Sequence, residues 1–253
     1  MGRLALPLAS GQPEGMTTTL ITGANKGLGL ETARQLLAAG HTVYVGSRDR
    51  ERGGAAVASL GSANARLLLI DVTDDSSVAA AAKAVEADGG LDVLVNNAGI
   101  EARTAANGIV GAADLTAGMV RHLFETNVFG LVRVTHALLP VLGRSGAPVI
   151  VNVSSGLGSL AGASDPNALG YGYPGVEYPA SKSAVNMITV QYAKAFPGMR
   201  VNAADPGFTN TDLNGRTGTQ TVAEGAEVIV RLAQVAPDGP TGGYFDRRGP
   251  IPW

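Results

Sequence analysis

Short apolar runs rich in β-branched residues alternate with amphipathic segments along most of the chain. The short runs predict strands, because polar or glycine-rich stretches bound them. These strands are expected at 17–22, 41–46, 66–70, 91–95, 149–153, 200–204 and 243–245. Between them, apolar residues that repeat with the helical period predict helices at 28–39, 50–60, 75–87, 129–139, 178–196 and 222–235.

This alternation predicts an α/β fold, a single-domain doubly wound (Rossmann) parallel sheet. Right-handed crossovers would place its strands in the order 3-2-1-4-5-6-7. Ligands of such a sheet bind outside the carboxyl ends of the strands, at the switch point between the first and the fourth. We expect this one catalytic domain to span 16–253, and 1–15 to be a flexible extension, because Met16 stands directly before the first strand.

Charge and composition exclude several classes of protein. The 253 residues carry 19 basic and 21 acidic side chains, which leaves no strong positive field for nucleic acid or an anionic membrane. There is no cysteine, which fits a reducing, cytoplasmic location and excludes thiol chemistry. The three histidines lie in separate segments without metal-ligand spacing, so no metal site is expected. A secretory signal is rejected, because the first core strand follows too closely.

A glycine-rich turn follows the first strand. Gly23 would allow a tight exit from the strand, while Gly27 and Gly29 would let the backbone and the next helix approach a pyrophosphate. The spacing departs from the common G-x-G-x-x-G fingerprint, so an ordinary strand-to-helix turn is the alternative. The predicted cofactor-binding turn comprises Gly23, Asn25, Lys26, Gly27, Leu28 and Gly29.

Two further turns face the same expected crevice. After the fourth strand, the Asn96 and Asn97 side chains can tie the turn to neighbouring strands, and the small residues Ala98 and Gly99 leave space for a ribose. The alternative is an ordinary polar turn. After the third strand, Asp71 either accepts a hydrogen bond from an adenine amino group or caps the next helix. The predicted cofactor-binding residues here are Asp71, Val72, Asn97, Ala98 and Gly99.

The catalytic signal lies at the start of the helix predicted at 178–196. Tyr178 and Lys182 are four residues apart, which places both side chains on one helix face. A nearby ammonium favours the phenolate and makes the tyrosine a usable acid or base. Ser155, just beyond the fifth strand, can hold a carbonyl oxygen against the phenol. Asn127 could anchor a water molecule that links Lys182 to solvent.

Together these segments resemble the short-chain dehydrogenase/reductase family, from about Thr17 to the C-terminus. The resemblance implies a catalytic tetrad of Asn127, Ser155, Tyr178 and Lys182, in which Tyr178 protonates the carbonyl oxygen and Lys182 also binds the nicotinamide ribose. It further implies that a segment after the sixth strand holds the nicotinamide carboxamide. That segment contains Pro206, Gly207, Thr209 and Thr211. GANKGLGL, GSRDRERG and the tail DGPTGGYFDRRGPIPW are most similar to the carbonyl reductase subgroup.

The choice of cofactor depends on charge at the end of the second strand. NAD enzymes place a carboxylate there, and that carboxylate repels the additional phosphate of NADP. Here Arg48 can bind a phosphate, and Lys26 can add a second positive charge from the glycine turn. The alternative is that Asp49 is the NAD-type carboxylate, or that it caps the next helix. The charges favour NADP(H).

We therefore expect an NADPH-dependent reductase of an aldehyde, ketone or quinone. The alternatives are a dehydrogenase of a specific secondary alcohol and a non-catalytic NADP-sensing module. The 22 residues between Ser155 and Tyr178 are more than in the plain family pattern but fewer than in long-insert carbonyl reductases. This segment, 156–177, is expected to cover part of the substrate pocket, with apolar contacts from Tyr171, Tyr173 and Pro174; the alternative is a plain surface excursion. The resemblance also implies that such an insert masks a helix face used for oligomerisation, which favours a monomer.

Overall fold

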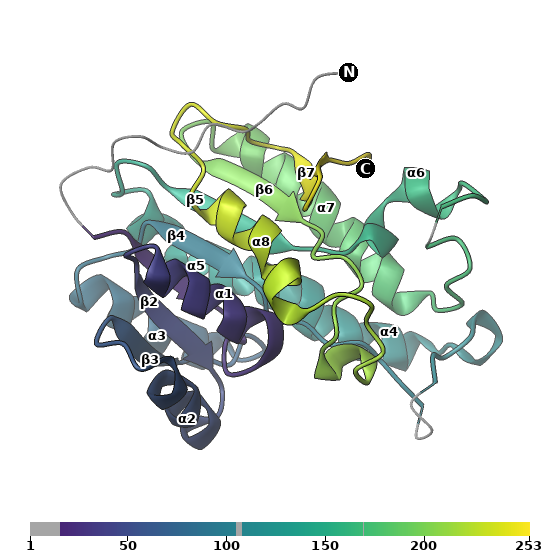
Figure 1. The fold of residues 1–253 in the computed structure, drawn as a ribbon, viewed down its shortest axis with the longest axis horizontal. Helices are drawn as coiled ribbons and strands as arrows, with labels where there is room; N and C mark the ends of the chain where they lie inside the picture. Colours follow the sequence, from purple (N-terminus) through teal and green to yellow (C-terminus); the bar gives the residue numbers. More distant parts are fainter. Residues whose placement is uncertain (1–15, 105–107, 169) are drawn as a thin grey trace.

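Eight strands form one sheet in the order β3-β2-β1-β4-β5-β6-β7-β8 (Figure 1). The computed structural model describes residues 16–104, 108–168 and 170–253. Neighbouring strands from β3 to β7 are parallel, and β7 and β8 are antiparallel. The strands are β1 (Thr18–Ile21), β2 (Thr42–Ser47), β3 (Ala65–Leu69), β4 (Val93–Asn96), β5 (Val149–Val153), β6 (Arg200–Ala204), β7 (Tyr244–Asp246) and β8 (Gly249–Pro250).

Helices cover both faces of the sheet. The α-helices are α1 (Gly27–Ala38), α2 (Arg50–Leu60), α3 (Asp75–Ala87), α4 (Ala117–Phe124), α5 (Leu131–Leu142), α6 (Leu160–Ala163), α7 (Glu177–Ala195) and α8 (Val222–Ala233). A π-helical segment, η2 (Glu125–Gly130), joins α4 to α5. Three short 3-10 turns are η1 (Ala112–Asp114), η3 (Gly156–Gly158) and η4 (Asp212–Asn214). In Figure 1, α1 and α8 lie in front of the sheet.

Alternate residues of the strands enter two separate core layers. Leu20 and Leu94 belong to the layer that contains side chains of α3, α5 and α7. Their neighbours Ile21 and Val95 belong to the layer that contains side chains of α1, α2 and α8. All four are fully buried, as expected for strands with a helix layer on each face.

A ladder of buried polar side chains crosses the centre of this sheet. Asn96 Nδ2 donates to Asn152 Oδ1 (2.9 Å) and to Thr135 Oγ1 (3.0 Å). Asn152 Nδ2 in turn donates to Thr189 Oγ1 (2.9 Å), which belongs to α7. Buried polar groups are costly unless they are hydrogen-bonded, so this ladder fixes α5 and α7 relative to β4 and β5.

The predicted fold class and the strand order 3-2-1-4-5-6-7 are confirmed. The predicted bounds 50–60, 75–87, 149–153 and 200–204 agree with α2, α3, β5 and β6. The helix predicted through 129–139 lies within a longer helical run that begins at Ala117 and ends at Leu142. The π-helical segment shifts the helical period, so apolar residues on its two sides do not form one pattern. The pattern also does not predict β8, because two residues, Gly249 and Pro250, carry no strand periodicity.

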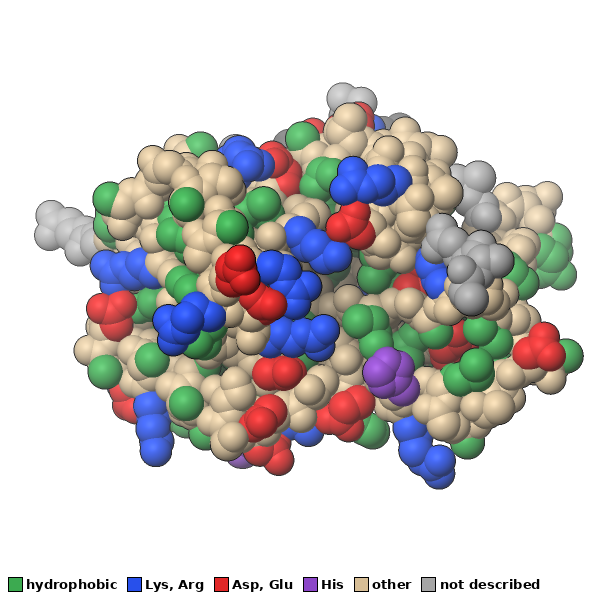
Figure 2. Space-filling model, turned by 90° about the horizontal axis from the view of Figure 1, so that it is seen from below, with side chains coloured by type: hydrophobic (Ala, Val, Ile, Leu, Met, Phe, Trp, Pro, Cys, Tyr) green, Lys and Arg blue, Asp and Glu red, His purple; other side chains and the backbone are tan. Residues whose placement is uncertain are grey.

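Residues 1–15, predicted as a flexible extension, lie outside the described residues. Within the described residues, no helix is both long and apolar enough to cross a membrane. Figure 2 shows positive and negative side chains mixed on one face, in keeping with the net charge of -2. Such mixing favours local ion pairs over a field of one sign.

Candidate active site

The glycine turn between β1 and α1 packs directly against the turn after β4. Gly23 has a φ of +63°, and a Cβ at Gly29 would lie 2.5 Å from Asn97 Nδ2. Asn97 Nδ2 donates to the carbonyl oxygens of Thr22 (2.8 Å) and Gly23 (3.2 Å). The expectation that an asparagine ties these turns together is confirmed. Gly23 needs glycine for its positive φ, and Gly29 needs it for lack of space.

The N-terminus of α1 has the features of an anion site. Lys26 is its N-cap residue and makes no side-chain capping hydrogen bond, whereas Asp49 and Thr221 cap α2 and α8. A Cβ at Gly27 would have Thr211 as its nearest neighbour, at 3.8 Å from Cγ2. Amide groups at an uncapped helix N-terminus attract anions, so this turn fits the pyrophosphate of a dinucleotide.

The other residues predicted for these turns lie in the same region. Asn25 is half-buried, and Leu28 Cδ2 would contact a Cβ at Gly225, so the Leu28 side chain packs toward α8. Ala98 Cα lies 3.0 Å from the Cβ position of Gly23. A Cβ at Gly99 would lie 3.4 Å from Asn127 Oδ1 and 3.7 Å from Lys182 Nζ. The turn after β4 therefore joins the predicted cofactor and catalytic residues.

Lys26 has a protein partner that the sequence does not reveal. Its Nζ lies 3.2 Å from Asp212 Oδ2, and both side chains are largely exposed. Arg216 also pairs with Asp212, at 2.8 Å. Lys26 therefore has a partner in the protein besides the phosphate contact that the sequence predicts. Asp212 lies 186 positions after Lys26 in the sequence, in the segment after β6, and only folding brings the two together.

Arg48 and Asp49, directly after β2, have different roles, which the sequence alone leaves open. Asp49 accepts the backbone N–H of Arg52 (2.9 Å) and pairs with its Nε (2.9 Å), so it is the cap of α2. Arg48 is exposed and makes no hydrogen bond or ion pair with any described residue. The helix-cap interpretation of Asp49 is confirmed, and its carboxylate is committed to α2. The positive charge of Arg48 remains available to a ligand.

Asp71 forms a local turn after β3. Its Oδ1 accepts the backbone N–H of Thr73 (3.0 Å) and the Thr73 hydroxyl (2.7 Å). Asp74 is the N-cap of α3, so the alternative in which Asp71 caps that helix is wrong. Val72 is 8% exposed and packs in the core, where its β-carbon would lie 3.1 Å from a Cβ at Gly130. Any contact between Val72 and a cofactor would therefore use its backbone.

Tyr178, Ser155 and Lys182 meet where α7 begins beside the carboxyl end of β5. Tyr178 is 8% exposed and Lys182 is 5% exposed. Lys182 Nζ donates to the carbonyl oxygen of Val153 (2.8 Å) and lies 5.6 Å from the centre of the Tyr178 ring. Ser155 is half-buried, whereas its neighbour Ser154 is fully buried and bonds Asn186 (2.6 Å). The structure therefore places Ser155 of the serine pair at the phenol.

The electrostatics of this site differ from the simplest expectation. Burial raises the pKa of Tyr178, the charge of Glu101 raises it further, and hydrogen bonding to Ser155 works in the opposite direction. Burial lowers the pKa of Lys182 to about 8. We expected the ammonium to lower the pKa of the phenol, but desolvation dominates here because both groups are withdrawn from water.

Asn127 positions neighbouring segments by hydrogen bonds on both sides of its amide. Its Oδ1 accepts the N–H of Ile100 (2.8 Å), and its Nδ2 donates to the Ile100 carbonyl oxygen (2.9 Å). Nδ2 also donates to Ser181 Oγ (3.1 Å), and Ser181 Oγ donates to the Tyr178 carbonyl oxygen (2.8 Å). The role expected for Asn127, anchoring a water molecule beside Lys182, stays a prediction.

The segment after β6 lies next to the glycine turn. Gly207, which follows Pro206, has a φ of +70° and turns the chain away from the sheet. Thr209 is buried, and its hydroxyl donates to the Pro206 carbonyl oxygen (2.9 Å) while accepting from Gln220 (2.8 Å). Thr211, by contrast, faces Gly27. The Thr209 hydroxyl thus closes its own loop, and Thr211 is the better placed of the two threonines for a ligand.

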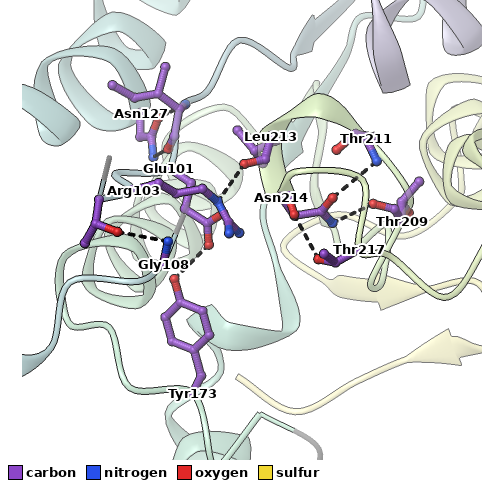
Figure 3. A network of polar contacts seen from close by, with 12 residues as sticks. Glu101, Arg103, Gly108, Asn127, Tyr173, Thr209, Thr211, Leu213, Asn214 and Thr217 are labelled. Carbon is purple, nitrogen blue, oxygen red and sulfur yellow. Dashed lines mark hydrogen bonds and ion pairs between the residues drawn. The ribbon is translucent and has the colours of Figure 1, made fainter. Parts of the chain in front are cut away.

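Several residues near Tyr178 have no signal in the sequence motifs. Figure 3 shows Glu101 and Arg103 beside the Tyr173 hydroxyl, which donates to Glu101 Oε1 (2.7 Å). Tyr173 was expected to supply apolar contact only, and this polar role adds to that expectation. Asp205 accepts the N–H of Gly207 (2.9 Å), and burial raises its pKa. Glu101 could have been identified from the sequence by its position, because it is a charged residue directly after the turn that follows β4.

The tail also reaches the site. Tyr244 donates its hydroxyl to the Ser155 carbonyl oxygen. Its ring stacks on Trp253 with centroids 5.2 Å apart and an interplanar angle of 14°. Ala161 donates its N–H to the Trp253 carbonyl oxygen (3.0 Å). The tail therefore fixes the segment that follows Ser155.

A doubly wound sheet with these groups at its switch point defines a class of oxidoreductases that use a nicotinamide dinucleotide. The model of the short chain dehydrogenase family matches residues 17–222, and the chain belongs to this family. It is 41% identical over 226 residues to the short-chain dehydrogenase anuI of Penicillium roqueforti, covering 85% of this chain and 87% of that protein.

Two solved structures show the same fold. The salutaridine reductase of Papaver somniferum has a TM-score of 0.79 and 28% identity, over 90% of this chain and 99% of that one. The NADPH-bound carbonyl reductase from chicken fatty liver has a TM-score of 0.79 and 27% identity, over 94% of this chain and 99% of that one.

Proposed function

We propose that this protein is an NADPH-dependent reductase that converts an aldehyde, ketone or quinone to an alcohol. The observation that carries the proposal is that the buried side chains of Tyr178 and Lys182 lie together with Ser155 at the carboxyl end of β5. This is the edge at which a doubly wound sheet binds its ligands. The uncapped N-terminus of α1 lies at the same edge and supports dinucleotide binding there.

Each catalytic side chain has a separate task in this proposal. When bound, the dinucleotide supplies the hydride for the carbonyl carbon. Ser155 holds the carbonyl oxygen, and Tyr178 donates its proton to that oxygen. Lys182 donates one hydrogen bond to the Val153 carbonyl oxygen. Its other two N–H groups would donate to the ribose hydroxyls and to the phenol oxygen. Burial excludes water around the phenol, so that proton is delivered to the substrate rather than exchanged with solvent.

The preference for NADPH rests on Arg48. Its guanidinium has no partner among the described residues, and Asp49 is held by Arg52. A charge-assisted hydrogen bond is worth about 1.5–3 kcal/mol, which corresponds to roughly 10-fold to 150-fold in affinity. The carbonyl reductase with a similar fold is bound to NADPH, which supports the same choice. Lys26 contributes less than its charge suggests, because Asp212 competes for it.

Two other functions make different predictions about turnover. A dehydrogenase of a secondary alcohol would use the same residues in the reverse direction, and relatives named (+)-neomenthol dehydrogenase fit that function. A non-catalytic NADP sensor would need the glycine turn but not the assembled Tyr178, Ser155 and Lys182. The assembled site favours an enzyme over the sensor.

The test is oxidation of NADPH and NADH by the purified protein across a panel of aldehydes, ketones and quinones. We expect turnover with NADPH that falls at least about 100-fold in Tyr178→Phe, the scale of positioned acid catalysis, while NADPH binding persists. Tyr192→Phe, a tyrosine farther along the same helix, is the matched control. Cofactor binding without turnover on any substrate would support the sensor, and normal turnover in Tyr178→Phe would remove Tyr178 from the mechanism.

We also propose that the protein is a cytoplasmic monomer. The segment 156–177 leads directly into α7, so it lies beside a helix face that could otherwise associate. Covering of a helix face by this segment would disfavour tight association. Light scattering at low protein concentration tests the monomer, and a stable tetramer would refute it.

A further inference from the structure

Glu101 belongs to the loop after β4 and lies beside the active site. Its side chain is 6% exposed, and its Oε2 accepts from Arg103 Nε (3.0 Å) and Nη2 (2.5 Å). Its Oε1 accepts the Tyr173 hydroxyl (2.7 Å). Arg103 Nε also donates to the Leu213 carbonyl oxygen (3.1 Å). Figure 3 shows these contacts joining three segments that are distant in the sequence.

A chain of hydrogen bonds fixes Glu101 relative to the phenol. Its neighbour Ile100 is held by Asn127 through both backbone groups (2.8 and 2.9 Å). Asn127 bonds Ser181, and Ser181 bonds the carbonyl oxygen of Tyr178. The carboxylate therefore has a fixed place near the site, and its charge is the largest electrostatic contribution from another residue that raises the pKa of Tyr178.

A second negative group acts on the same phenol, and a third carboxylate precedes Tyr178 in the sequence and acts on Tyr173. Asp205, from the end of β6, also raises the pKa of Tyr178 through its charge. Glu177, the first residue of α7, is 2% exposed, and its Oε2 has no hydrogen-bond partner among the described residues. The positive side chains nearby already have partners in the protein. Arg103 donates to the Glu101 carboxylate and to the Leu213 carbonyl oxygen, and Lys182 donates to the Val153 carbonyl oxygen.

We propose that Glu101 is a specificity-determining residue that makes this site accept neutral or cationic carbonyl compounds and disfavour those that carry a carboxylate. The inference rests on the proposed function, because it assumes that the carbonyl binds at Tyr178. An anionic substrate would have to lose its hydration beside a fixed carboxylate, and the two nearby cations, Arg103 and Lys182, already donate to Glu101 and Val153. A neutral substrate of the same shape meets no such cost.

The experiment compares 4-acetylbenzamide with 4-acetylbenzoate, two ketones of nearly equal shape that differ in charge. We expect kcat/KM for the benzamide to exceed that for the benzoate by at least about 10-fold, as a like charge in a partly dry site implies. Glu101→Gln should reduce this ratio by roughly 5-fold or more, because it removes the charge and keeps the side-chain shape. Tyr173→Phe keeps the charge, so it should leave the ratio unchanged even if KM rises for both ketones.

A second measurement separates charge from mere support of the loop. In the direction of alcohol oxidation, kcat/KM rises with pH as Tyr178 loses its proton, and this rise should move to lower pH in Glu101→Gln and stay in place in Tyr173→Phe, because only the former removes the charge that raises the pKa of Tyr178. Glu227→Gln, at an exposed site on α8, is the surface control and should change neither measurement.

Binding of both ketones to the enzyme with NADP is measured by calorimetry, so selectivity can be detected even without turnover. Tighter binding of the benzamide without reduction would support charge selection and refute the proposed reaction. Equal or preferred use of the benzoate would overturn charge selection and leave the reductase intact, and it would indicate that Arg103 releases Glu101 to bind the substrate carboxylate. Failure of both ketones to bind or react would overturn the proposed charge selection, whereas the proposed reductase is overturned only if no carbonyl compound of the panel turns over.

Discussion

Replacing Lys182 by Met should make the stability of this protein less dependent on pH. The pKa of Lys182 falls from 10.5 to about 8 because the ammonium is buried, so the folded chain holds this charge at a cost. A difference of roughly 2.5 pKa units corresponds to roughly 3 kcal/mol at neutral pH. Methionine removes that cost but leaves the Val153 carbonyl oxygen without its donor, which costs about 1–3 kcal/mol.

The pH dependence is the sharper prediction, because the lost hydrogen bond contributes equally at every pH. Below pH 8, Lys182 is protonated in both the folded and the unfolded chain, and the full cost of burial is present. Between pH 8 and 10.5 only the unfolded chain keeps the proton, so the wild-type protein gains stability as pH rises. From pH 7 to 9.5 this gain amounts to roughly 2 kcal/mol.

The assay is urea unfolding of wild type and Lys182→Met at several pH values from 7 to 9.5. The free energy of unfolding of the variant relative to wild type should fall by roughly 2 kcal/mol over that range. Lys194→Met, at an exposed site on the same helix, is the control and should follow wild type throughout. A difference between Lys182→Met and wild type that does not change with pH would refute the assignment of a buried ammonium.

Three further substitutions test separate parts of the structure. Arg48→Asp should raise KM for NADPH by roughly 10-fold to 150-fold and change KM for NADH far less, and equal effects in initial-rate kinetics would contradict phosphate binding by Arg48. Asn152→Ala should cost about 2–4 kcal/mol in urea unfolding, because it leaves Asn96 and Thr189 without their buried partner; a loss below about 1 kcal/mol would mean that the ladder adds little. Trp253→Ala should lower stability by about 0.5–1.5 kcal/mol beyond the lost burial, whereas Trp253→Phe should retain most of it; equal loss in both would exclude a stacking contribution.

The strands and their order could be predicted from the sequence. Each strand follows from a local pattern of residues, and the order follows from general rules of connection. Strand-like runs such as Val149–Val153 are short and apolar, and right-handed crossovers allow few ways to arrange them. The glycine turn could also be located, since Gly23 and Gly29 are needed for a positive φ and a close approach. The π-helical segment Glu125–Gly130 could not, because it breaks the periodicity on which helix prediction depends.

Partners distant in the sequence explain most of what was missed at the site. Lys26 pairs with Asp212 and Glu101 bonds Tyr173, and each partner comes from a loop that no local pattern places. The same is true of the C-terminal tail, whose Trp253 reaches Tyr244 and the segment after Ser155 only in the folded chain. Motif spacing identifies residues on one element, whereas these contacts depend on how separate loops meet at the edge of the sheet.

The acidity of Tyr178 shows how burial decides what a motif can do. The four-residue spacing places Lys182 correctly, yet both groups are buried, so desolvation raises the pKa of the phenol and lowers that of the lysine to about 8. The charge of Glu101 adds to the first effect. At neutral pH the phenol therefore holds its proton firmly, which is the form that a carbonyl reductase needs at the start of its reaction. Oxidation of an alcohol would need the phenolate, which the buried site and its acidic neighbours disfavour.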